Sequence, residues 1–209
     1  MLAKGSLSWI GGAILLAFAA GYAFIYSGLA SMMFAFLFGI LVILAIFFII
    51  FFRDPERTPE GDENDAVSPA DGRVISMQDR TICIFMNIHN VHVNRAPLAG
   101  TVTHIDYKPG GYIPAFNKDS YVNERNHVVM KTEHSALEIT QIAGVLTRRI
   151  VSYISEGSEL KRGERIGMIR FGSRVDVIIP KGYEFTVKVN DRVRAGETII
   201  AMLKEKNRR

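Results

Sequence analysis

The sequence predicts a mainly β domain of the barrel-sandwich hybrid type, preceded by an N-terminal two-helix transmembrane anchor. The first 52 residues carry one charged side chain, Lys4, whereas all 21 acidic residues lie in 53–209. Short β-branched runs punctuated by Gly, Pro and Asn fill the rest of the chain, and two pairs of segments repeat each other there. The uneven charge excludes a uniform soluble domain, and the composition excludes collagen-like, disordered and disulfide-scaffold classes.

Residues 1–52 are predicted to be a membrane anchor. A spanning helix needs roughly 20 apolar residues, and the uncharged run over 8–52 is about twice that length. A break at Tyr26-Ser27-Gly28 predicts two spans, Leu7–Tyr26 and Leu29–Phe52, joined as a hairpin. A single long tilted helix is the alternative. The run is too long for a signal peptide, whose apolar region has about 7–15 residues.

The charges around this hairpin predict which side of the membrane the domain occupies. Both ends of a hairpin lie on one side, and Lys4, Arg53 and Arg57 lie at those ends. The positive-inside rule therefore favours the cytoplasmic side of the cell membrane. The single cysteine, Cys83, agrees, because an extracytoplasmic domain could have used disulfides. Residues 53–65 are polar, contain two prolines and are predicted to be a linker.

The domain over 66–209 is predicted to consist of short strands. Period-2 alternation and β-branched residues mark these strands, and the one helical periodicity falls around Gly144–Ser155. The predicted strands are Arg73–Met77, Thr81–Met86, Gly100–Tyr107, His127–Thr132, Leu137–Ala143, Ile166–Phe171, Arg174–Ile179, Glu184–Val189 and Thr198–Leu203.

Internal repeats indicate the type of β fold. Ser158–Ile166 matches Asp191–Ile199, and Pro69–Val74 matches Pro97–Val102. In each segment a Gly permits a tight turn before a strand. The pattern resembles that of biotinyl and lipoyl carrier domains. Those carriers place a lysine at a hairpin tip within a characteristic sequence that this chain lacks, so the resemblance supports the fold and not a carrier function.

Several residues are candidates for chemistry. His89 and His92 are three residues apart, but further metal ligands at suitable spacing are missing from the sequence, so no metal site is predicted. Asp71 and Ser173 each lie in a turn-forming sequence. Ser173 is not in a nucleophile elbow, because Val175 stands where that motif needs Gly. A serine hydrolase built from Ser173, His92 and Asp71 remains an alternative, since such triads are defined by geometry.

Four motifs taken together are more specific than any one alone. They are Ser-Pro-Ala-Asp-Gly at 68–72, His-Asn-Val-His-Val-Asn-Arg-Ala-Pro at 89–97, Asn-Glu-Arg-Asn at 123–126 and Phe-Gly-Ser-Arg-Val-Asp at 171–176. In this order they strongly resemble the phosphatidylserine decarboxylase family in its short form, over essentially all of 53–209. An archaetidylserine decarboxylase would carry the same motifs.

The resemblance implies a proenzyme that cuts itself between Gly172 and Ser173. The products would be a β chain, 1–172, and an α chain, 173–209, in which Ser173 has become a pyruvoyl group. In the family this group forms a Schiff base with the substrate amine and acts as the electron sink, without pyridoxal phosphate or metal. By the same resemblance, Ser173 is the nucleophile of self-cleavage, His92 its general base and later a proton donor, and Asp71 the acidic partner that fixes the imidazole tautomer.

Further residues and partners follow from the resemblance and the charge. His89, Arg95, Lys118 and Arg125 are candidate contacts for the carboxylate or phosphate of a membrane phospholipid. Nucleic acid is disfavoured as a partner, because 53–209 carries 24 basic against 21 acidic residues, without a basic-aromatic motif. A homo-oligomer is compatible with the sequence. The alternative from another class is a membrane-tethered, non-catalytic carrier-like β-domain.

Overall fold

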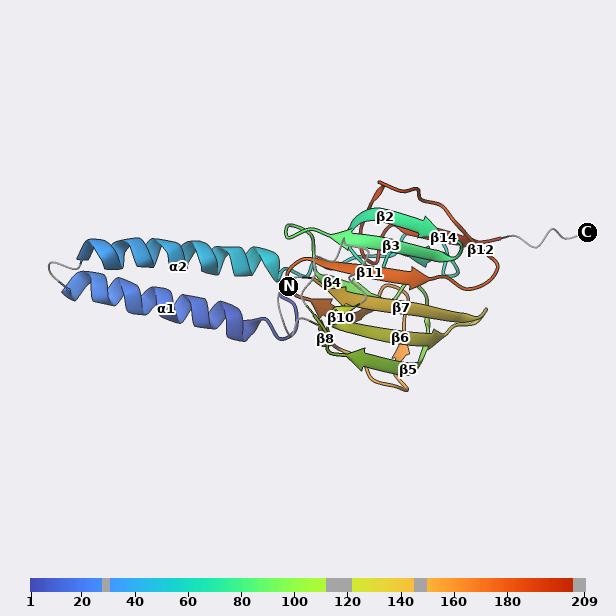
Figure 1. The fold of residues 1–209 in the computed structure, drawn as a ribbon, viewed down its shortest axis with the longest axis horizontal. Coiled ribbons are helices and arrows are strands. Elements are labelled where there is room, and N and C mark those ends of the chain that lie inside the picture. The colour runs from blue at the N-terminus through green and yellow to red at the C-terminus, as the bar shows by residue number, and fades with distance from the viewer. Residues whose placement is uncertain (28–30, 112–121, 145–149, 205–209) are drawn as a thin grey trace, which may run out of the picture. The chain divides into compact units, whose positions relative to one another are not determined.

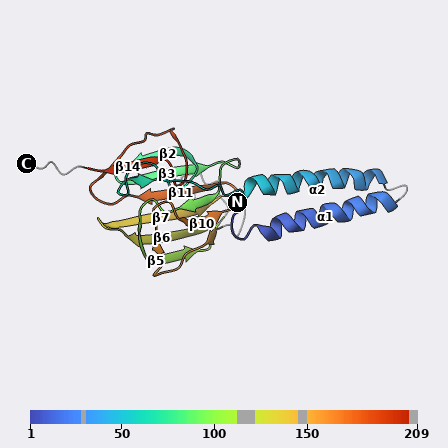
Figure 2. The ribbon, with the colours of Figure 1, turned by 180° about the vertical axis from the view of Figure 1, so that it is seen from behind.

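The structure, a computed structural model, describes residues 1–27, 31–111, 122–144 and 150–204. The chain divides into two compact units, Met1–Pro55 and Glu56–Arg209. The first unit contains the two helices, and the second contains the strands, as the two views of the ribbon show (Figures 1 and 2). The prediction of a mainly β domain preceded by two apolar helices is confirmed.

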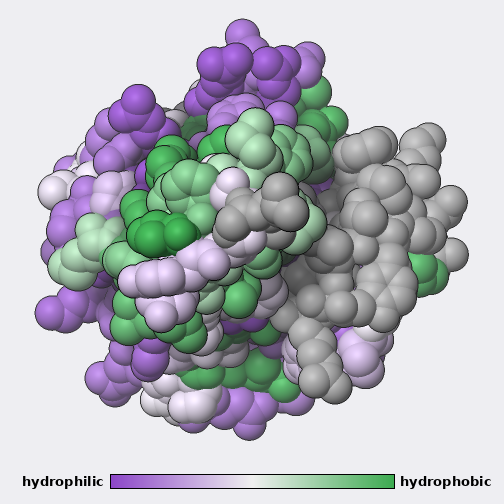
Figure 3. Space-filling view, turned by 90° about the vertical axis from the view of Figure 1, so that its left-hand side faces the viewer, coloured by the Kyte–Doolittle hydropathy of each residue, from purple (hydrophilic) through white to green (hydrophobic). Residues whose placement is uncertain are grey.

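The first unit is a pair of helices, α1 (Leu7–Tyr26) and α2 (Ser31–Phe51). Both are long and apolar enough to cross a membrane. Ala13, Ala17 and Ala20 are buried on the face of α1 that packs on α2, because small side chains let two helix backbones approach closely. Most other side chains of the pair are exposed and apolar. Figure 3 draws one face of the whole chain, on which both apolar (green) and hydrophilic (purple) residues are seen.

The longer strands of the second unit closely follow the predicted ones, whereas most of its strands of two or three residues were not predicted. The strands are β1 (Ala66–Val67), β2 (Gly72–Gln78), β3 (Thr81–Met86), β4 (Val93–Arg95), β5 (Gly100–Lys108), β6 (Arg125–Lys131), β7 (Ala136–Ala143), β8 (Ile150–Ser152), β9 (Glu159–Leu160), β10 (Arg165–Ile169), β11 (Ser173–Ile178), β12 (Tyr183–Phe185), β13 (Arg192–Val193) and β14 (Ile199–Leu203).

A curled eight-stranded antiparallel sheet dominates this unit, in the order β13-β2-β3-β11-β7-β6-β5-β9. Two three-stranded sheets complete it, β1-β14-β12 and β4-β10-β8. Figures 1 and 2 show β2, β3, β11, β7, β6 and β5 side by side, with β11 in the middle. The placement of β11 matters for function, because its first residue is Ser173.

The core follows from strict alternation along the central strands. β3 and β11 bury every second side chain, as expected when one face of a sheet is packed and the other faces solvent. The inner face is lined by branched and sulfur-containing side chains, among them Ile82, Ile84, Met86, Val128, Met130, Leu137, Ile139, Val175 and Val177.

Two predicted segments differ from the structure. Ile150–Ser152, inside the predicted helical stretch, is a strand that pairs with β10, while 145–149 lie outside the described residues. The predicted strand over Glu184–Val189 ends at Phe185, because pairing with β14 stops there. Alternation alone therefore did not locate the strand end, which depends on where a partner strand is present.

The internal repeats form matching turns. Gly163 and Gly196 occupy equivalent positions in one pair of repeats, and both have left-handed φ values, 77° and 72°. The N–H of Gly163 donates to the carbonyl oxygen of Ala96 at 2.8 Å, and that of Gly196 to the carbonyl of Ser68 at 2.7 Å. Each repeat of one pair thus donates a hydrogen bond to the residue directly before a repeat of the other pair, and Asp71 lies three residues after Ser68.

The single thiol lies on the half-buried outer face of β3 and is expected to be unreactive. Burial, with the nearby Asp176 carboxylate, raises the pKa of Cys83 to about 12. Thiolate therefore forms only as the pH rises toward that value, and at pH 8 its fraction is roughly a thousandfold below that of an ordinary thiol. We expect a disulfide reagent at pH 8 to label the denatured chain quickly and the folded chain very slowly; equal rates would contradict this.

Candidate active site

Ser173 is the first residue of the central strand β11, held between Met86 of β3 and Ala143 of β7. Its side chain is completely buried on the inner face of the sheet. The hydroxyl donates to the thioether sulfur of Met86 at an Oγ–Sδ distance of 3.3 Å. A thioether is a weak acceptor, so the serine hydroxyl is fixed in place without being held by a strong hydrogen bond.

The two residues before Ser173 have unusual backbone conformations. Phe171 and Gly172 both have positive φ values, 59° and 65°. Glycine adopts this region readily, but for a bulky residue such as Phe171 it is strained. The strain therefore lies next to the bond predicted to be cut.

The carbonyl group of Gly172 packs tightly against the backbone at Gly144. A Cβ atom at position 144 would lie 2.0 Å from the Gly172 carbonyl oxygen, which real contacts do not allow. Only glycine at 144 lets this carbonyl keep its position. The corner around the predicted cleavage site is thus built from two glycines, one in each approaching segment.

We expect Gly144→Ala to slow self-cleavage at least tenfold, because the added methyl group must displace the Gly172 carbonyl and a small misplacement of reacting groups is costly. Pulse-labelled precursor, made by cell-free synthesis and followed on denaturing gels, measures the rate. Gly111→Ala is the matched control, because a Cβ there meets its nearest atom at 3.7 Å. Equal cutting rates for the Gly144→Ala chain and the unsubstituted chain would contradict the expectation.

His92 is buried immediately before β4. Its Nδ1 atom lies 2.9 Å from the carbonyl oxygen of Asn90. A carbonyl only accepts, so Nδ1 carries the proton and, in the neutral ring, Nε2 is the basic nitrogen. The main-chain carbonyl of His92 accepts from the N–H of Ile169 at 3.2 Å, at the end of the strand that leads to Gly172.

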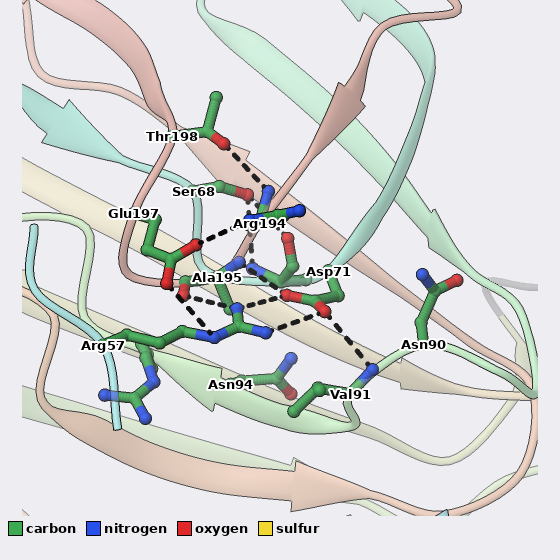
Figure 4. A network of polar contacts seen from close by, with 12 residues as sticks. Arg57, Ser68, Asp71, Asn90, Val91, Asn94, Arg194, Ala195, Glu197 and Thr198 are labelled. Atoms are coloured by element: carbon green, nitrogen blue, oxygen red, sulfur yellow. Dashed lines mark hydrogen bonds and ion pairs between the residues drawn. The ribbon is translucent and has the colours of Figure 1, made fainter. Parts of the chain in front are cut away.

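Asp71 lies in a turn before β2 and is bound from several sides (Figure 4). Both carboxylate oxygens accept from the Arg57 guanidinium, with Nη2 at 3.0 Å from Oδ2. The N–H of Ala195 donates to Oδ1 at 2.8 Å, and that of Val91 to Oδ2 at 3.4 Å. Asp71 therefore contacts the main chain at Val91, the residue before His92. The hydrogen-bond partner of the His92 Nδ1 atom is the carbonyl oxygen of Asn90.

Arg57 is a residue of this site that sequence reasoning missed. Its position in the sequence predicts a linker charge near the membrane, but its side chain is 7% exposed and pairs with Asp71. It also donates to the carbonyl oxygen of Ala195 at 2.7 Å and lies 3.8 Å from Glu197. An ion pair between residues 14 positions apart in irregular segments leaves no periodic signal, so the sequence offered nothing to identify it.

Buried amide side chains extend from Ser173 into the sheet interior. The Nδ2 atom of Asn94 lies 3.6 Å from the same Met86 sulfur that accepts from Ser173. Asn94 Oδ1 accepts from Gln141 at 2.8 Å, and Gln141 Oε1 accepts from Asn126 at 3.0 Å. This amide chain gives the otherwise apolar inner face polar groups that reach Met86, whose sulfur also accepts from Ser173.

The remaining predicted residues occupy different surroundings. His89 is exposed in the turn between β3 and β4, and Arg125 is half-buried at the start of β6. Arg95 is buried, and its guanidinium donates to the Gly163 carbonyl oxygen at 2.9 Å. Lys118 lies outside the described residues. Within the described part of the chain, no group of three His, Cys, Asp or Glu side chains could hold a metal ion.

The family model for phosphatidylserine decarboxylase matches residues 44–201. A protein from Methanococcoides burtonii named "Putative archaetidylserine decarboxylase proenzyme" is 51% identical over 99% of this chain and 98% of its own. The phosphatidylserine decarboxylase proenzymes of Streptomyces griseus and Magnetococcus marinus are 52% and 45% identical, over 71% and 74% of this chain and 70% and 77% of theirs.

The β domain places a buried serine directly after two residues with positive φ. Its relatives are named decarboxylase proenzymes, so the protein class is a decarboxylase made as a precursor. The chain belongs to the phosphatidylserine decarboxylase family. The family resemblance predicted from the four sequence motifs is thereby confirmed.

Proposed function

We propose that this chain decarboxylates phosphatidylserine to phosphatidylethanolamine, after cutting itself between Gly172 and Ser173. The observation that carries the proposal is the family match, combined with Ser173 lying buried directly after two left-handed residues. Names of relatives that include the word proenzyme support a precursor that matures by cleavage.

In the proposed self-cleavage, the Ser173 hydroxyl attacks the carbonyl carbon of Gly172. His92 takes the hydroxyl proton through Nε2, the nitrogen left basic when Nδ1 donates to Asn90. The peptide C–N bond is exchanged for an ester to Oγ, and elimination then releases the Gly172 carboxylate. Tautomerisation and hydrolysis of the remaining dehydroalanine, with loss of ammonia, leave a pyruvoyl group at residue 173.

Asp71 acts, in this proposal, on the placement of His92. Its carboxylate accepts from the N–H of Val91, the residue before His92, and is itself fixed by Arg57 and Ala195. A fixed main chain at 90–92 holds the imidazole where its Nδ1 meets the Asn90 carbonyl. The position of the His92 imidazole would then depend on the Asp71–Arg57 ion pair, which acts on the main chain at Val91.

The surroundings of Ser173 fit a pyruvoyl group. The group is about as large as serine, so the buried space between Met86 and Ala143 would hold it. The group would supply a carbonyl for the substrate amine and an electron sink for decarboxylation. His92 would return a proton to the substrate carbon, and Asn94 would offer an amide N–H beside the reacting atoms. His89, Arg95, Lys118 and Arg125 are proposed contacts for the carboxylate or phosphate.

The lipid backbone has a second candidate. The relative that matches 99% of this chain, including the helices, is named for archaetidylserine, an ether lipid with the same headgroup. All proposed chemistry lies at the serine headgroup, so the same site would serve either lipid. Assaying the purified full chain with both lipids in matched nanodiscs would decide which is the substrate.

The two apolar helices support membrane association. We place the enzyme in the cell membrane with its β domain on the cytoplasmic side, because Lys4 and Arg53 lie directly outside the two helices. The mature enzyme would consist of the β chain 1–172 and the α chain 173–209, and a homo-oligomer of such pairs is compatible with this arrangement.

Mass spectrometry under denaturing conditions tests the proposal. The mature preparation should contain a 37-residue fragment, 173–209, with a pyruvoyl N-terminus, and should release carbon dioxide from phosphatidylserine in nanodiscs. His92→Ala should slow cutting by roughly 10²–10⁴-fold, the usual loss when a general base is removed. An intact 23.3 kDa chain without turnover would support the non-catalytic alternative, and labelling of Ser173 by a fluorophosphonate would support the hydrolase alternative.

A further inference from the structure

A row of basic side chains crosses the outer face of the eight-stranded sheet. Residues directly opposite one another in neighbouring antiparallel strands project to the same face, so a chain of such pairs defines a row. From β13 to β5, one unbroken chain of pairs consists of Arg192, Arg73, Phe85, Arg174, Ile142, Arg125 and Lys108. Five of these seven residues are basic, and we call them the basic row.

The basic row lies at the end of the sheet where cleavage is proposed. Arg174 follows Ser173 directly in β11, and the two side chains point to opposite faces. The same strands carry a different set two rows further along, where the paired residues are Gln78, Thr81, Ile178, Glu138, Val129 and His104. That row has one acid and no lysine or arginine, so positive charge is concentrated at the Ser173 end.

Part of the row is neutralised within the sheet, and part is not. Arg174 pairs with Asp176 at 2.9 Å, and Lys108 with Asp106 at 2.8 Å. Arg73 and Arg192 are exposed and lie directly opposite each other on β2 and β13. Neither makes an ion pair or a side-chain hydrogen bond with any part of the chain that the structure describes.

Two like charges in directly opposite positions repel each other and destabilise a sheet. An anionic ligand would relieve this repulsion, and its size can be judged from the row. Seven strands at about 4.8 Å spacing make the row about 29 Å long, far longer than one phosphate group and suited to a surface of many phosphates. Ile142 is buried and Phe85 is half-buried in the middle of the row, so its exposed cations are Arg73, Arg192 and Lys108.

We propose that the basic row binds the anionic headgroups of a phospholipid bilayer and so docks the β domain on the membrane surface at its Ser173 end. The inference rests on the proposed function in one respect, since the lipid substrate would lie in the surface that is bound. Apart from Arg125, which is also a proposed substrate contact, the row is separate from the residues proposed for catalysis on the inner face. Docking of the basic row would shorten the path from the bilayer to Ser173.

Headgroup quenching of a fluorophore on the full chain in nanodiscs tests the docking. In a Cys83→Ala background, a dye is attached through Ile88→Cys, in the turn just beyond the Ser173 end of β3. A second preparation carries the dye through Gln78→Cys, at the other end of β2. The nanodiscs contain phosphatidylcholine with or without phosphatidylglycerol, and a small fraction of lipid with a spin-labelled headgroup.

We expect phosphatidylglycerol to increase quenching at position 88 and not at 78, and 1 M salt to abolish the increase by screening. Arg73→Gln/Arg192→Gln should reduce the ratio of docked to undocked domain roughly thirtyfold, since each cation near such a surface contributes about 1 kcal/mol. Lys131→Gln/Lys181→Gln is the matched control: it removes two exposed charges at the opposite end of the strands and should leave quenching unchanged.

Three outcomes would overturn the proposal. They are equal quenching with neutral and anionic lipid, an equal loss in the control variant, and release by inorganic phosphate beyond that by chloride at equal ionic strength. The last result would indicate a discrete phosphate site. Because quenching requires neither cutting nor turnover, an uncut or inactive chain can still show docking. Failure of the proposed function is thus distinguishable from failure of this inference.

Discussion

Ser173→Ala is expected to remain a single chain of 209 residues and to release no carbon dioxide from phosphatidylserine. The substitution removes the only atom proposed to attack Gly172, so neither the α chain nor the pyruvoyl group can form. The change should hardly disturb folding, because the hydroxyl bonds only to the weak acceptor Met86 Sδ within the described structure. Denaturing electrophoresis and a headgroup decarboxylation assay measure the two effects.

Ser76→Ala provides the control for this experiment. Ser76 is exposed on β2, which is separated from β11 by β3, and the Ser76→Ala chain should be cut and active like the unsubstituted chain. If the Ser173→Ala chain yields the 173–209 fragment, cleavage must use another nucleophile. If it is uncut but decarboxylates the lipid, the proposed origin of the cofactor is wrong.

The second large effect is expected at the buried Arg57–Asp71 pair. Asp71→Asn should lower the free energy of unfolding by about 3 kcal/mol, the lower end for a broken buried pair, because the buried guanidinium keeps only Glu197, at 3.8 Å, as a counter-charge. Cutting should slow by at least a hundredfold, since Val91 and His92 lose their fixed support. Arg57→Gln should have comparable effects, because it removes the same ion pair.

A double-mutant cycle separates this pair from two independent structural residues. If both act through one contact, Asp71→Asn/Arg57→Gln should cost little more than either single change, in stability and in cutting rate. Arg165→Gln serves as the control, because its partner Glu56 is 61% exposed and such surface pairs contribute about 0–1 kcal/mol. Additive losses in the cycle would show that Arg57 does not act through Asp71.

The sequence predicted the parts of this fold that depend on local pattern. The α1 span was predicted to the residue, and β3 likewise, because charge absence and alternation are properties of a single segment. The end of β12 and the strand at Ile150–Ser152 were not predicted, because both depend on pairing with strands distant in sequence.

The candidate site shows the same division. Asp71, His92 and Ser173 were identified from motifs, and their backbone segments do lie near one another through Val91 and Ile169. The partners of these side chains could not be read from the sequence. The His92 Nδ1 atom bonds to a main-chain carbonyl, and Asp71 pairs with a buried arginine. Both contacts depend on how loops distant in sequence pack together, and loops have no sequence periodicity.

The central position of β11 has a consequence for the mature enzyme. If the chain is cut before Ser173, the α chain holds its place by pairing with both β3 and β7, over six residues on each side. Losing it would require opening the middle of the sheet, so it should not exchange while the domain is folded. Once denatured and diluted, however, the two pieces must find each other again in a second-order reaction. Recovery of activity should therefore depend on protein concentration for the cut enzyme, whereas the uncut precursor refolds as one molecule.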